Sequence, residues 1–301
     1  MAYLILEPKL FPEQSINLLE RLGKVFLGSE AVKGHEGIID TIFVRLGFYI
    51  DQPFMSKYPN CNFIVSPTTG INHISEQVQL SHEIIYLETD EPILSKIPAT
   101  AEFTLALILS AVKRIDEILR GKPDYRNRDE FLSYDINDKK VLIIGMGRIG
   151  KKVAKYLDSM DAQVFYIDEK VIDNKYTPLS FNHPLLSEID IVSVHMNFKK
   201  ENQEILDKNF FMKLENLKLF VNTARGELIS EVALRNFAFK NPECKIFLDV
   251  LSEEQKNQGK SRLRLSKNIK ITPHVGGNSI DSRQKVESYI VQKYLRIKNA
   301  Y

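Results

Sequence analysis

Residues 141–168, VLIIGMGRIGKKVAKYLDSMDAQVFYID, constrain the fold more than any other part of the chain. An apolar strand runs into Gly145, Gly147 and Gly150, a helical pattern follows, and a second strand closes the segment. The first glycine permits a tight turn, the second lets the backbone approach a pyrophosphate, and the third lets the helix pack closely on the strand. The N–H groups at the helix start would bind the phosphates. The segment therefore predicts a βαβ dinucleotide-binding unit in a parallel sheet.

Asp168 ends the second strand of this unit, where an acid commonly binds the ribose hydroxyls of NAD. Its negative charge would also repel the 2′-phosphate of NADP. Glu169 strengthens this preference for NAD, whereas Lys170 opposes it. An ordinary acid at a strand end is the alternative interpretation. The intact strand–helix–strand unit favours the cofactor role and predicts NAD as the cofactor.

Strand and helix patterns also alternate on both sides of this unit. Before it, buried strands are predicted at Ile38–Leu46 and Asn62–Pro67, with an amphipathic helix at Phe11–Gly23. One long helix is predicted over Ala99–Leu119. After the unit, a C-terminal helix is preceded by at least four further strand-like runs: DIVSVHM, LKLFVNTA, KIFLDVL and IKITPH. With 301 residues, the chain is long enough for two α/β domains.

Composition argues against several classes of function. Lys plus Arg number 41 and Asp plus Glu number 39, and the formal charge of +2 argues against a nucleic-acid partner. The two cysteines, Cys61 and Cys244, are too few for a disulfide framework, which favours a reducing, cytoplasmic setting. No signal peptide is expected, and the apolar helical run Phe103–Val112 has roughly half the length of a membrane span. No Cys/His cluster has metal-ligand spacing, so no metal is predicted.

Six segments stand in a recognisable order across nearly the whole chain: PTTGINHI, ATAEFTLALILSAVKRI, GMGRIGKKVA, VNTARGELISEVAL, LDVLSEE and TPHVGG. Together they resemble the D-isomer-specific 2-hydroxyacid dehydrogenases. The resemblance implies an α/β fold of two doubly wound parallel-sheet domains, with a Rossmann NAD-binding domain inserted into a flavodoxin-like substrate domain. It assigns residues 1–96 and 281–301 to the substrate domain and residues 97–280 to the NAD-binding domain.

The resemblance also implies a catalytic group of three residues. His274 would be the acid/base, because a histidine exchanges its proton near neutral pH. A carboxylate on the other ring nitrogen would orient the imidazole and favour its protonated form. Family spacing favours Glu254 over the neighbouring Glu253, although Gln255 stands where the family usually has Pro. Arg225 would hold the substrate carboxylate with two parallel hydrogen bonds and polarise the 2-oxo group.

Further site residues follow from the same resemblance. The loop after the strand at Asn62–Pro67 would offer the backbone of Thr69 and Gly70 to the substrate carboxylate. His195 stands where the family often has a histidine, but Asn197 replaces the usual proline, so we interpret His195 as a wall of the cofactor cleft. The other predicted cofactor contacts are Gly145, Gly147, Arg148, Ile149, Gly150, Asp168, Thr223, Ala224, Asp249 and Gly277.

The implied function is NAD-dependent hydride transfer between nicotinamide and a small D-2-hydroxy acid or 2-oxo acid. Arg45 stands where phosphoglycerate-type relatives tend to carry an Arg near the substrate phosphate, so a phosphorylated substrate remains one alternative. A non-catalytic NAD(H)-sensing scaffold, like the family's corepressor relatives, is another, which the presence of Arg225, Glu254 and His274 disfavours. The family also implies a homodimer, in which Phe103–Val112 would face a partner as well as its own core.

Overall fold

The computed structural model describes residues 1–121, 125–254, 256–257 and 259–298. The chain divides into two compact units, and the sequence of unit 2 is inserted within that of unit 1. Unit 1 comprises Met1–Ile97, Gln255–Gln258 and Asn278–Tyr301, and unit 2 comprises Pro98–Glu254 and Gly259–Gly277. Gln255 and residues 299–301 of the predicted C-terminal segment lie outside the described residues.

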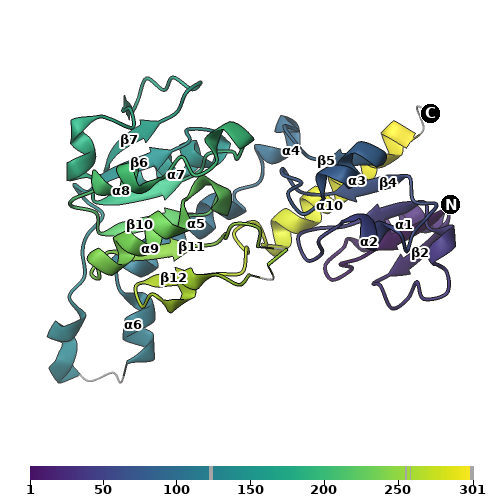
Figure 1. Ribbon diagram of the computed structural model, residues 1–301, viewed down its shortest axis with the longest axis horizontal. Helices are drawn as coiled ribbons and strands as arrows, with labels where there is room; N and C mark the ends of the chain where they lie inside the picture. Colours follow the sequence, from purple (N-terminus) through teal and green to yellow (C-terminus); the bar gives the residue numbers. More distant parts are fainter. Residues whose placement is uncertain (122–124, 255, 258, 299–301) are drawn as a thin grey trace. The chain divides into compact units, whose positions relative to one another are not determined.

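Unit 1 is built on a five-stranded parallel sheet with the strand order β2-β1-β3-β4-β5 (Figure 1). This is the order of flavodoxin-like folds. Its strands are β1 (Ala2–Ile5), β2 (Lys24–Leu27), β3 (Thr41–Phe43), β4 (Phe63–Ser66) and β5 (Glu83–Tyr86). Its helices are α1 (Glu13–Glu20), η1 (Glu36–Ile38), α2 (Gln52–Met55), α3 (Glu76–Ser81), α4 (Glu91–Leu94) and the C-terminal α10 (Ile280–Lys298).

Unit 2 has a seven-stranded parallel sheet with the order β12-β11-β10-β9-β6-β7-β8, the doubly wound arrangement of dinucleotide-binding folds. The strands are β6 (Lys140–Ile144), β7 (Gln163–Ile167), β8 (Thr177–Pro178), β9 (Ile191–Val194), β10 (Leu219–Asn222), β11 (Lys245–Leu248) and β12 (Ile269–Ile271). The α-helices are α5 (Ala99–Val112), α6 (Ile115–Arg120), α7 (Arg148–Asp158), α8 (Lys208–Met212) and α9 (Glu231–Lys240). The shorter 3₁₀ helices are η2 (Tyr125–Phe131), η3 (Pro184–Glu188), η4 (Lys200–Asn202), η5 (Gly226–Leu228) and η6 (Arg262–Leu265). The predicted fold class is confirmed.

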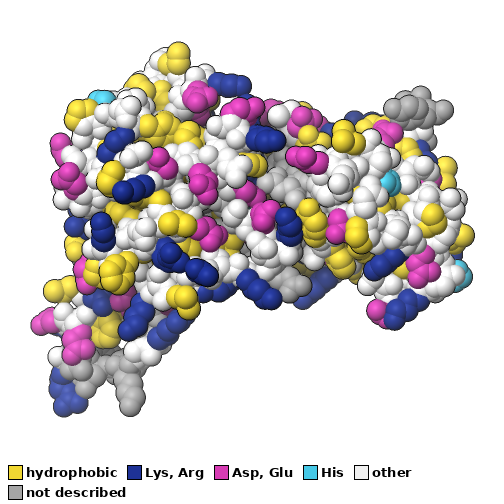
Figure 2. Space-filling view, in the orientation of Figure 1, with side chains coloured by type: hydrophobic (Ala, Val, Ile, Leu, Met, Phe, Trp, Pro, Cys, Tyr) yellow, Lys and Arg dark blue, Asp and Glu magenta, His cyan; other side chains and the backbone are white. Residues whose placement is uncertain are grey.

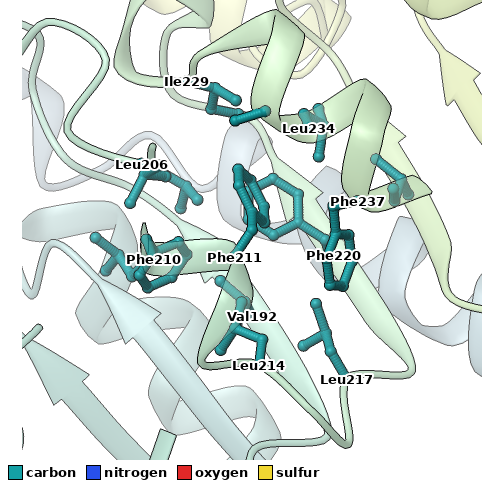
Figure 3. Packing of buried hydrophobic residues seen from close by; sticks show 14 of the residues in the cluster. Val192, Leu206, Phe210, Phe211, Leu214, Leu217, Phe220, Ile229, Leu234 and Phe237 are labelled. Carbon is teal, nitrogen blue, oxygen red and sulfur yellow. The ribbon is translucent and has the colours of Figure 1, made fainter. Parts of the chain in front are cut away.

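The sheet of unit 2 is buried on both faces because its strands send alternate side chains into two hydrophobic clusters. In β6, Leu142 and Ile144 belong to one cluster, and Val141 and Ile143 belong to the other. Figure 3 shows the aromatic rings at the centre of the first cluster: Phe210, Phe211, Phe220 and Phe237. Burial on both faces explains why these strands read as continuous apolar runs in the sequence. The sheet is therefore a rigid support for the loops at its carboxyl edge.

The single helix predicted over Ala99–Leu119 is wrong, because the structure contains two helices there. Arg114 has a φ of 57°, in the left-handed region, and separates α5 from α6. Its guanidinium donates hydrogen bonds to the carbonyl oxygens of Glu130 (2.8 Å) and Leu132 (3.2 Å). These contacts hold the break, and α6 and η2 project from unit 2 (Figure 1).

Charged side chains of both signs occur over the visible face of each unit (Figure 2), in keeping with the near-neutral net charge. Among the described residues, no helix combines the length and the apolar character that crossing a bilayer requires.

Candidate active site

The glycine-rich loop lies between β6 and α7 at the carboxyl edge of the seven-stranded sheet. Gly145 has a φ of 94°, and a Cβ there would lie 2.5 Å from the backbone nitrogen of Met196. A Cβ at Gly150 would lie 2.0 Å from the carbonyl oxygen of Gly145, so glycine alone lets α7 pack this close. At Gly147 a Cβ would meet no described atom within 4 Å, so the loop is open on that side. The three glycines fit the turn, packing and close-approach roles that a dinucleotide requires.

The loop also lies where the order of the strands reverses. β6 pairs with β7 on one side and β9 on the other, and ligands of open α/β sheets bind in the crevice at such a point. α7 begins at Arg148, so Arg148 and Ile149 form its first turn, where the helix dipole favours an anion. The position fits the phosphates of a dinucleotide.

Asp168 follows β7 and lies beside the glycine-rich loop. Its Oδ2 accepts a hydrogen bond from the N–H of Met146 (2.8 Å), and its Oδ1 accepts from the N–H groups of Lys170 and Val171 (both 2.8 Å). A carboxylate can accept about four hydrogen bonds, so capacity for a ribose hydroxyl remains. The carboxylate thus ties the loop to β7 in addition to its predicted cofactor role.

His195 follows β9, the strand next to the glycine-rich loop, and its N–H donates to the carbonyl of Ile144 (2.7 Å). Its Nε2 lies 2.8 Å from Oγ of buried Ser193, and its buried Nδ1 has no hydrogen-bond partner among the described residues. Although the residue as a whole is half-buried, burial of the imidazole lowers its pKa to about 3. His195 is therefore neutral near pH 7, which fits a cofactor-cleft wall better than a proton donor.

The low pKa of His195 should make the protein less stable in acid. An unfolded chain binds a proton on this residue below about pH 6.5, whereas the folded chain resists protonation down to about pH 3. The contribution is fully present above pH 6.5 and is lost as the pH falls, by up to about 1.4 kcal/mol per pH unit. Urea unfolding between pH 7 and pH 5 should show a steeper loss of unfolding free energy for the unmodified protein than for His195→Asn. Equal slopes would contradict the assignment.

Asn222, which the sequence analysis did not single out, shapes the loop after β10. Its side-chain Oδ1 accepts from the N–H of Ala224, and its Nδ2 donates to the carbonyl of Arg225, both at 2.9 Å. Thr223 is buried between them and exchanges a 2.8 Å hydrogen bond with Thr104 of α5. An Asn at a strand end that bridges its own loop was the available sequence signal. The bridge fixes the backbone from which Arg225 projects.

Arg225 has no ion-pair partner among the described residues. Its Nη1 donates to the carbonyl of Ala224 (2.7 Å). Part of the residue remains in contact with solvent, yet burial of the guanidinium lowers its pKa, while the charges of Glu227 and Glu254 act in the opposite direction. The guanidinium stays charged, because an arginine in a protein does not lose its proton. A largely buried, unpaired guanidinium is a ready site for an anionic ligand.

The backbone after Arg225 packs on the segment that leads to Glu254. A Cβ at Gly226 would lie 2.0 Å from the carbonyl carbon of Leu251, and the N–H of Leu251 donates to Oε2 of Glu254 (3.0 Å). The other carboxylate oxygen of Glu254 is hydrogen-bonded to Nδ1 of His274. Glu254, the glutamate that the family spacing favours, therefore contacts the imidazole. Glu253 itself has a φ of 47°, in the left-handed region.

Asp249, at the end of β11, holds the loop that carries His274. Its buried carboxylate accepts hydrogen bonds from the hydroxyl of Thr272 (2.6 Å) and the N–H groups of Val275 (2.9 Å) and Gly276 (2.7 Å). Its backbone carbonyl accepts from the N–H of His274 (2.9 Å). Asp249 is thus a positioning residue for the histidine loop, and its contact with the cofactor remains a prediction.

The remaining predicted positions lie in two places. At Gly277 of unit 2, an added Cβ would meet only Oγ1 of Thr100, at 3.7 Å, so the backbone is open to close approach. Thr69 and Gly70 follow β4 in unit 1, where Oγ1 of Thr68 donates to the carbonyl of Gly70 (2.7 Å) and braces the turn. Thr69 is exposed, as a loop that binds a ligand through its backbone requires.

Three features of unit 2 therefore lie at the carboxyl edge of its parallel sheet. They are the guanidinium of Arg225, the Glu254–His274 pair and the glycine-rich loop. Among the described residues, no group of three or more His, Cys, Asp or Glu side chains could hold a metal ion. The arrangement can bind an anion and exchange a proton.

The sequence profile of the D-isomer specific 2-hydroxyacid dehydrogenase family, NAD binding domain, matches residues 105–276. The chain belongs to this family. Membership confirms the resemblance and makes the chain an NAD-dependent oxidoreductase of the 2-hydroxyacid dehydrogenase type. The match spans the glycine-rich loop, Arg225, Glu254 and His274 together.

Relatives in this 2-hydroxyacid dehydrogenase family carry different activities. The chain is 28% identical over 271 residues to a glyoxylate reductase of Thermofilum pendens, covering 86% of this chain and 78% of the relative. It is 24% identical over 316 residues to a D-3-phosphoglycerate dehydrogenase of Archaeoglobus fulgidus, covering 100% of this chain but only 59% of the relative. Both relatives are similar to this chain, but they are named for different activities, so the comparison does not identify its substrate.

Solved structures support the fold of the 2-hydroxyacid dehydrogenase family. A Thermus thermophilus protein superposes with a TM-score of 0.80 at 23% identity, covering 100% of this chain and 97% of the other. A D-lactate dehydrogenase from Aquifex aeolicus, complexed with NAD and lactic acid, superposes with a TM-score of 0.74 at 21% identity, covering 100% and 96%. At these identities the likeness concerns the fold alone.

Proposed function

We propose that the protein reduces a small 2-oxo acid to its D-2-hydroxy acid with NADH, or catalyses the reverse oxidation. The observation that carries this proposal is Arg225, a largely buried guanidinium with no ion-pair partner among the described residues, beside the Glu254–His274 pair. A 2-oxo acid offers the carboxylate that would pair with the guanidinium and the carbonyl oxygen that would take the proton.

In this reaction each residue has a distinct part. NADH, when bound, would supply the hydride that C2 of the 2-oxo acid receives. Arg225 holds the carboxylate in a fixed orientation, and His274 gives its proton to the oxygen that becomes the hydroxyl. Glu254 holds the ring through Nδ1 and so orients the other ring nitrogen for the transfer. In oxidation the proton returns to the same nitrogen of His274.

We assign the cofactor to unit 2 and the remaining substrate contacts to unit 1. Supporting the first assignment are the open Gly147 and the unpartnered Nδ1 of His195, which fit a dinucleotide at the strand ends. Supporting the second is the braced turn at Thr69 and Gly70, whose backbone would bind the substrate carboxylate. We place the protein in the cytoplasm, where its two unlinked, buried cysteines would remain reduced.

A panel of 2-oxo acids tests the function most directly. The Thermofilum pendens relative is named a glyoxylate reductase, so glyoxylate, pyruvate and hydroxypyruvate should be tried first with NADH in an absorbance assay. Turnover of at least one of them is expected. NADH binding without turnover of any 2-oxo or D-2-hydroxy acid would instead favour the NAD(H)-sensing scaffold.

We expect NADH to be preferred over NADPH, because the charge of Asp168 opposes a 2′-phosphate. Asp168→Asn should lower the NADH-to-NADPH ratio of kcat/KM by about tenfold, since the like-charge repulsion disappears. The amide still offers one oxygen acceptor, so the hydrogen bonds to the loop are only partly lost. Asp173→Asn, further along the same segment, is the control. Equal use of both cofactors by the unmodified protein would refute the prediction.

We also propose a homodimer paired through unit 2. α5 packs on its own core through Ala101 and Ile108, and Leu105 and Leu109 pack against the same core but remain half-buried. Residues in α6 and after η2 add exposed apolar side chains: Ile115, Leu119, Leu132 and Tyr134. Apolar surface of this kind is common at subunit interfaces. Light scattering at micromolar concentration should give twice the mass of one chain, and a monomer would contradict the proposal.

A further inference from the structure

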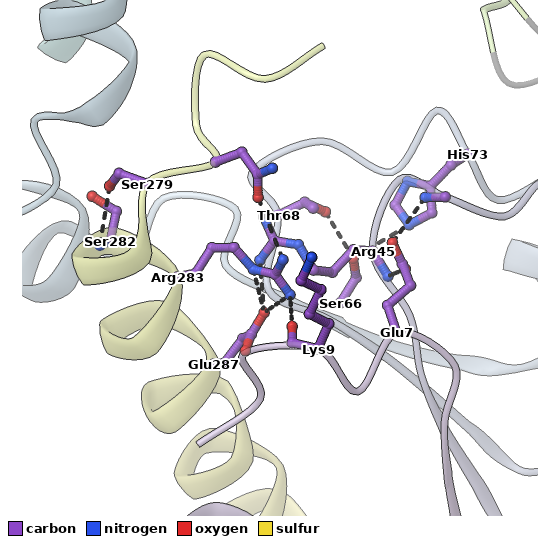
Figure 4. Close-up of polar contacts among 12 residues, drawn as sticks. Glu7, Lys9, Arg45, Ser66, Thr68, His73, Ser279, Ser282, Arg283 and Glu287 are labelled. Atoms are coloured by element: carbon purple, nitrogen blue, oxygen red, sulfur yellow. Dashed lines mark hydrogen bonds and ion pairs between the residues drawn. The ribbon is translucent and has the colours of Figure 1, made fainter. Parts of the chain in front are cut away.

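Unit 1 contains a buried cluster of charges at the start of α10, which we call the Arg45–Glu287–Arg283 cluster. The carboxylate of Glu287 is fully buried. Its Oε1 accepts hydrogen bonds from Nη1 of Arg45 (3.1 Å) and from Nε (3.1 Å) and Nη2 (2.9 Å) of Arg283 (Figure 4). Arg283 also donates to the carbonyl of Lys9 (2.8 Å). One carboxylate oxygen of Glu287 therefore accepts hydrogen bonds from two guanidinium groups.

This cluster shares an edge of the sheet with the predicted substrate loop. Arg45 follows β3 and Thr69 follows β4, and β3 and β4 are neighbouring parallel strands, so both residues lie at the carboxyl edge. Figure 4 shows Arg45 in the same region as Ser66 and Thr68, which brace that loop. The guanidinium of Arg45 at this edge would therefore influence which substrates the predicted loop can bind.

The charges around Arg45 cancel. Glu287 binds its side chain, and Glu7 accepts hydrogen bonds from the N–H groups of Arg45 and Gly47. The region thus holds two guanidinium groups, Arg45 and Arg283, and two carboxylates: Glu287 on the guanidinium groups and Glu7 on the backbone of Arg45. Lys9 is nearby through its carbonyl, but the residue is exposed, and a solvated ammonium contributes little. A phosphate would meet a guanidinium whose charge is already shared with buried Glu287, and the negative charges of Glu7 and Glu287 would oppose its binding.

We propose that Glu287 masks Arg45 and Arg283 and so restricts the protein to 2-oxo acids whose remaining substituent is uncharged. This inference rests on the proposed function and narrows it to unphosphorylated substrates. It also separates two uses of arginine in one chain. Arg225 has no ion-pair partner among the described residues, whereas Arg45 is already paired. The phosphorylated alternative raised by the position of Arg45 in the sequence is thereby disfavoured.

The test compares hydroxypyruvate with its 3-phosphate ester, which differ only in the charged group. For the unmodified protein, kcat/KM should favour hydroxypyruvate by about tenfold or more. Glu287→Gln keeps the shape of the side chain and releases the charge of both arginines. It should raise kcat/KM for the phosphate ester by about tenfold, as expected for a recovered charge-assisted hydrogen bond, and change that for hydroxypyruvate by less than about threefold.

Asp40→Asn is the matched control, because Asp40 precedes β3 and pairs with Lys298, near the other end of α10. It removes one negative charge and one ion pair to α10 at the opposite end of β3, and it should leave the ratio of the two substrates unchanged. Should Glu287→Gln not fold, the double variant Arg283→Gln/Glu287→Gln unmasks Arg45 without adding net charge, and it should show the same gain.

Three results would overturn the proposal. A preference of the unmodified protein for the phosphate ester would show that Arg45 is not masked, while leaving the proposed function intact. No gain for the phosphate ester in the folded variants would show that the cluster is only structural. Failure of the unmodified protein to turn over any 2-oxo acid would instead overturn the proposed function, on which this inference depends.

Discussion

Replacing His274 with Ala should lower turnover of the 2-oxo acid by about 100- to 10,000-fold, the usual cost of removing a general acid. NADH should still bind with nearly unchanged affinity, because the glycine-rich loop and Asp168 are untouched. Stopped-flow reduction and NADH fluorescence titration measure the two quantities separately. Because reduction takes a proton from His274 and oxidation returns one, the two directions in the unmodified protein should respond oppositely to pH.

Two variants define what the loss at His274 means. Glu254→Gln keeps a hydrogen-bond partner for Nδ1 but removes its charge, so turnover should fall by about tenfold, less than in His274→Ala. His183→Ala removes an imidazole whose described bond is to the N–H of Leu185, and it should retain full activity. A fully active His274→Ala protein would end the mechanism proposed above.

Arg225→Lys should lower kcat/KM for the 2-oxo acid by about 100-fold, although the positive charge is kept. An ammonium cannot provide the planar fork that binds both carboxylate oxygens, and one lost transition-state donor costs about 100- to 1,000-fold. The dissociation constant of NADH should change by less than about threefold. Steady-state kinetics over a range of substrate concentration, with a separate NADH titration, check both values.

Arg235→Lys on α9 provides the comparison, because it makes the same chemical change in a half-exposed helical residue. Its kinetics should match those of the unmodified protein. If Arg225→Lys also left the kinetics unchanged, the guanidinium would not bind the substrate carboxylate. If both kcat/KM and NADH affinity fell, Arg225 would instead support the cofactor loop.

The main architecture could be predicted from the sequence because it depends on local patterns. Gly145, Gly147 and Gly150 lie within six residues; Gly145 and Gly150 allow close packing in the same turn, and Gly147 leaves the loop open. The break at Arg114 could not be predicted, since α5 and α6 both have helical patterns and the interruption is held by carbonyl groups in the segment 130–132. The helix propensity of the residues around Arg114 gives no sign of such a contact.

The same distinction holds for the site. The spacing of the motifs points to His274 and Arg225, but the choice between Glu253 and Glu254 depends on backbone geometry, and only the folded loop shows which carboxylate meets the ring. The masking of Arg45 joins residues 242 positions apart and requires α10 to lie against the first sheet. Long-range pairs of buried charges have no periodic signature in a single sequence.

His274 has a φ of 52°, in the left-handed region that costs a residue with a Cβ roughly 1–3 kcal/mol. The three hydrogen bonds to Asp249 offset that strain and keep the imidazole in place. A chain that no longer needed the reaction would gain by discarding this arrangement, because Gly or Asn adopts the left-handed conformation more readily. Stability and activity therefore compete at this single position. An inactive descendant with His274→Gly or His274→Asn would have the higher free energy of unfolding.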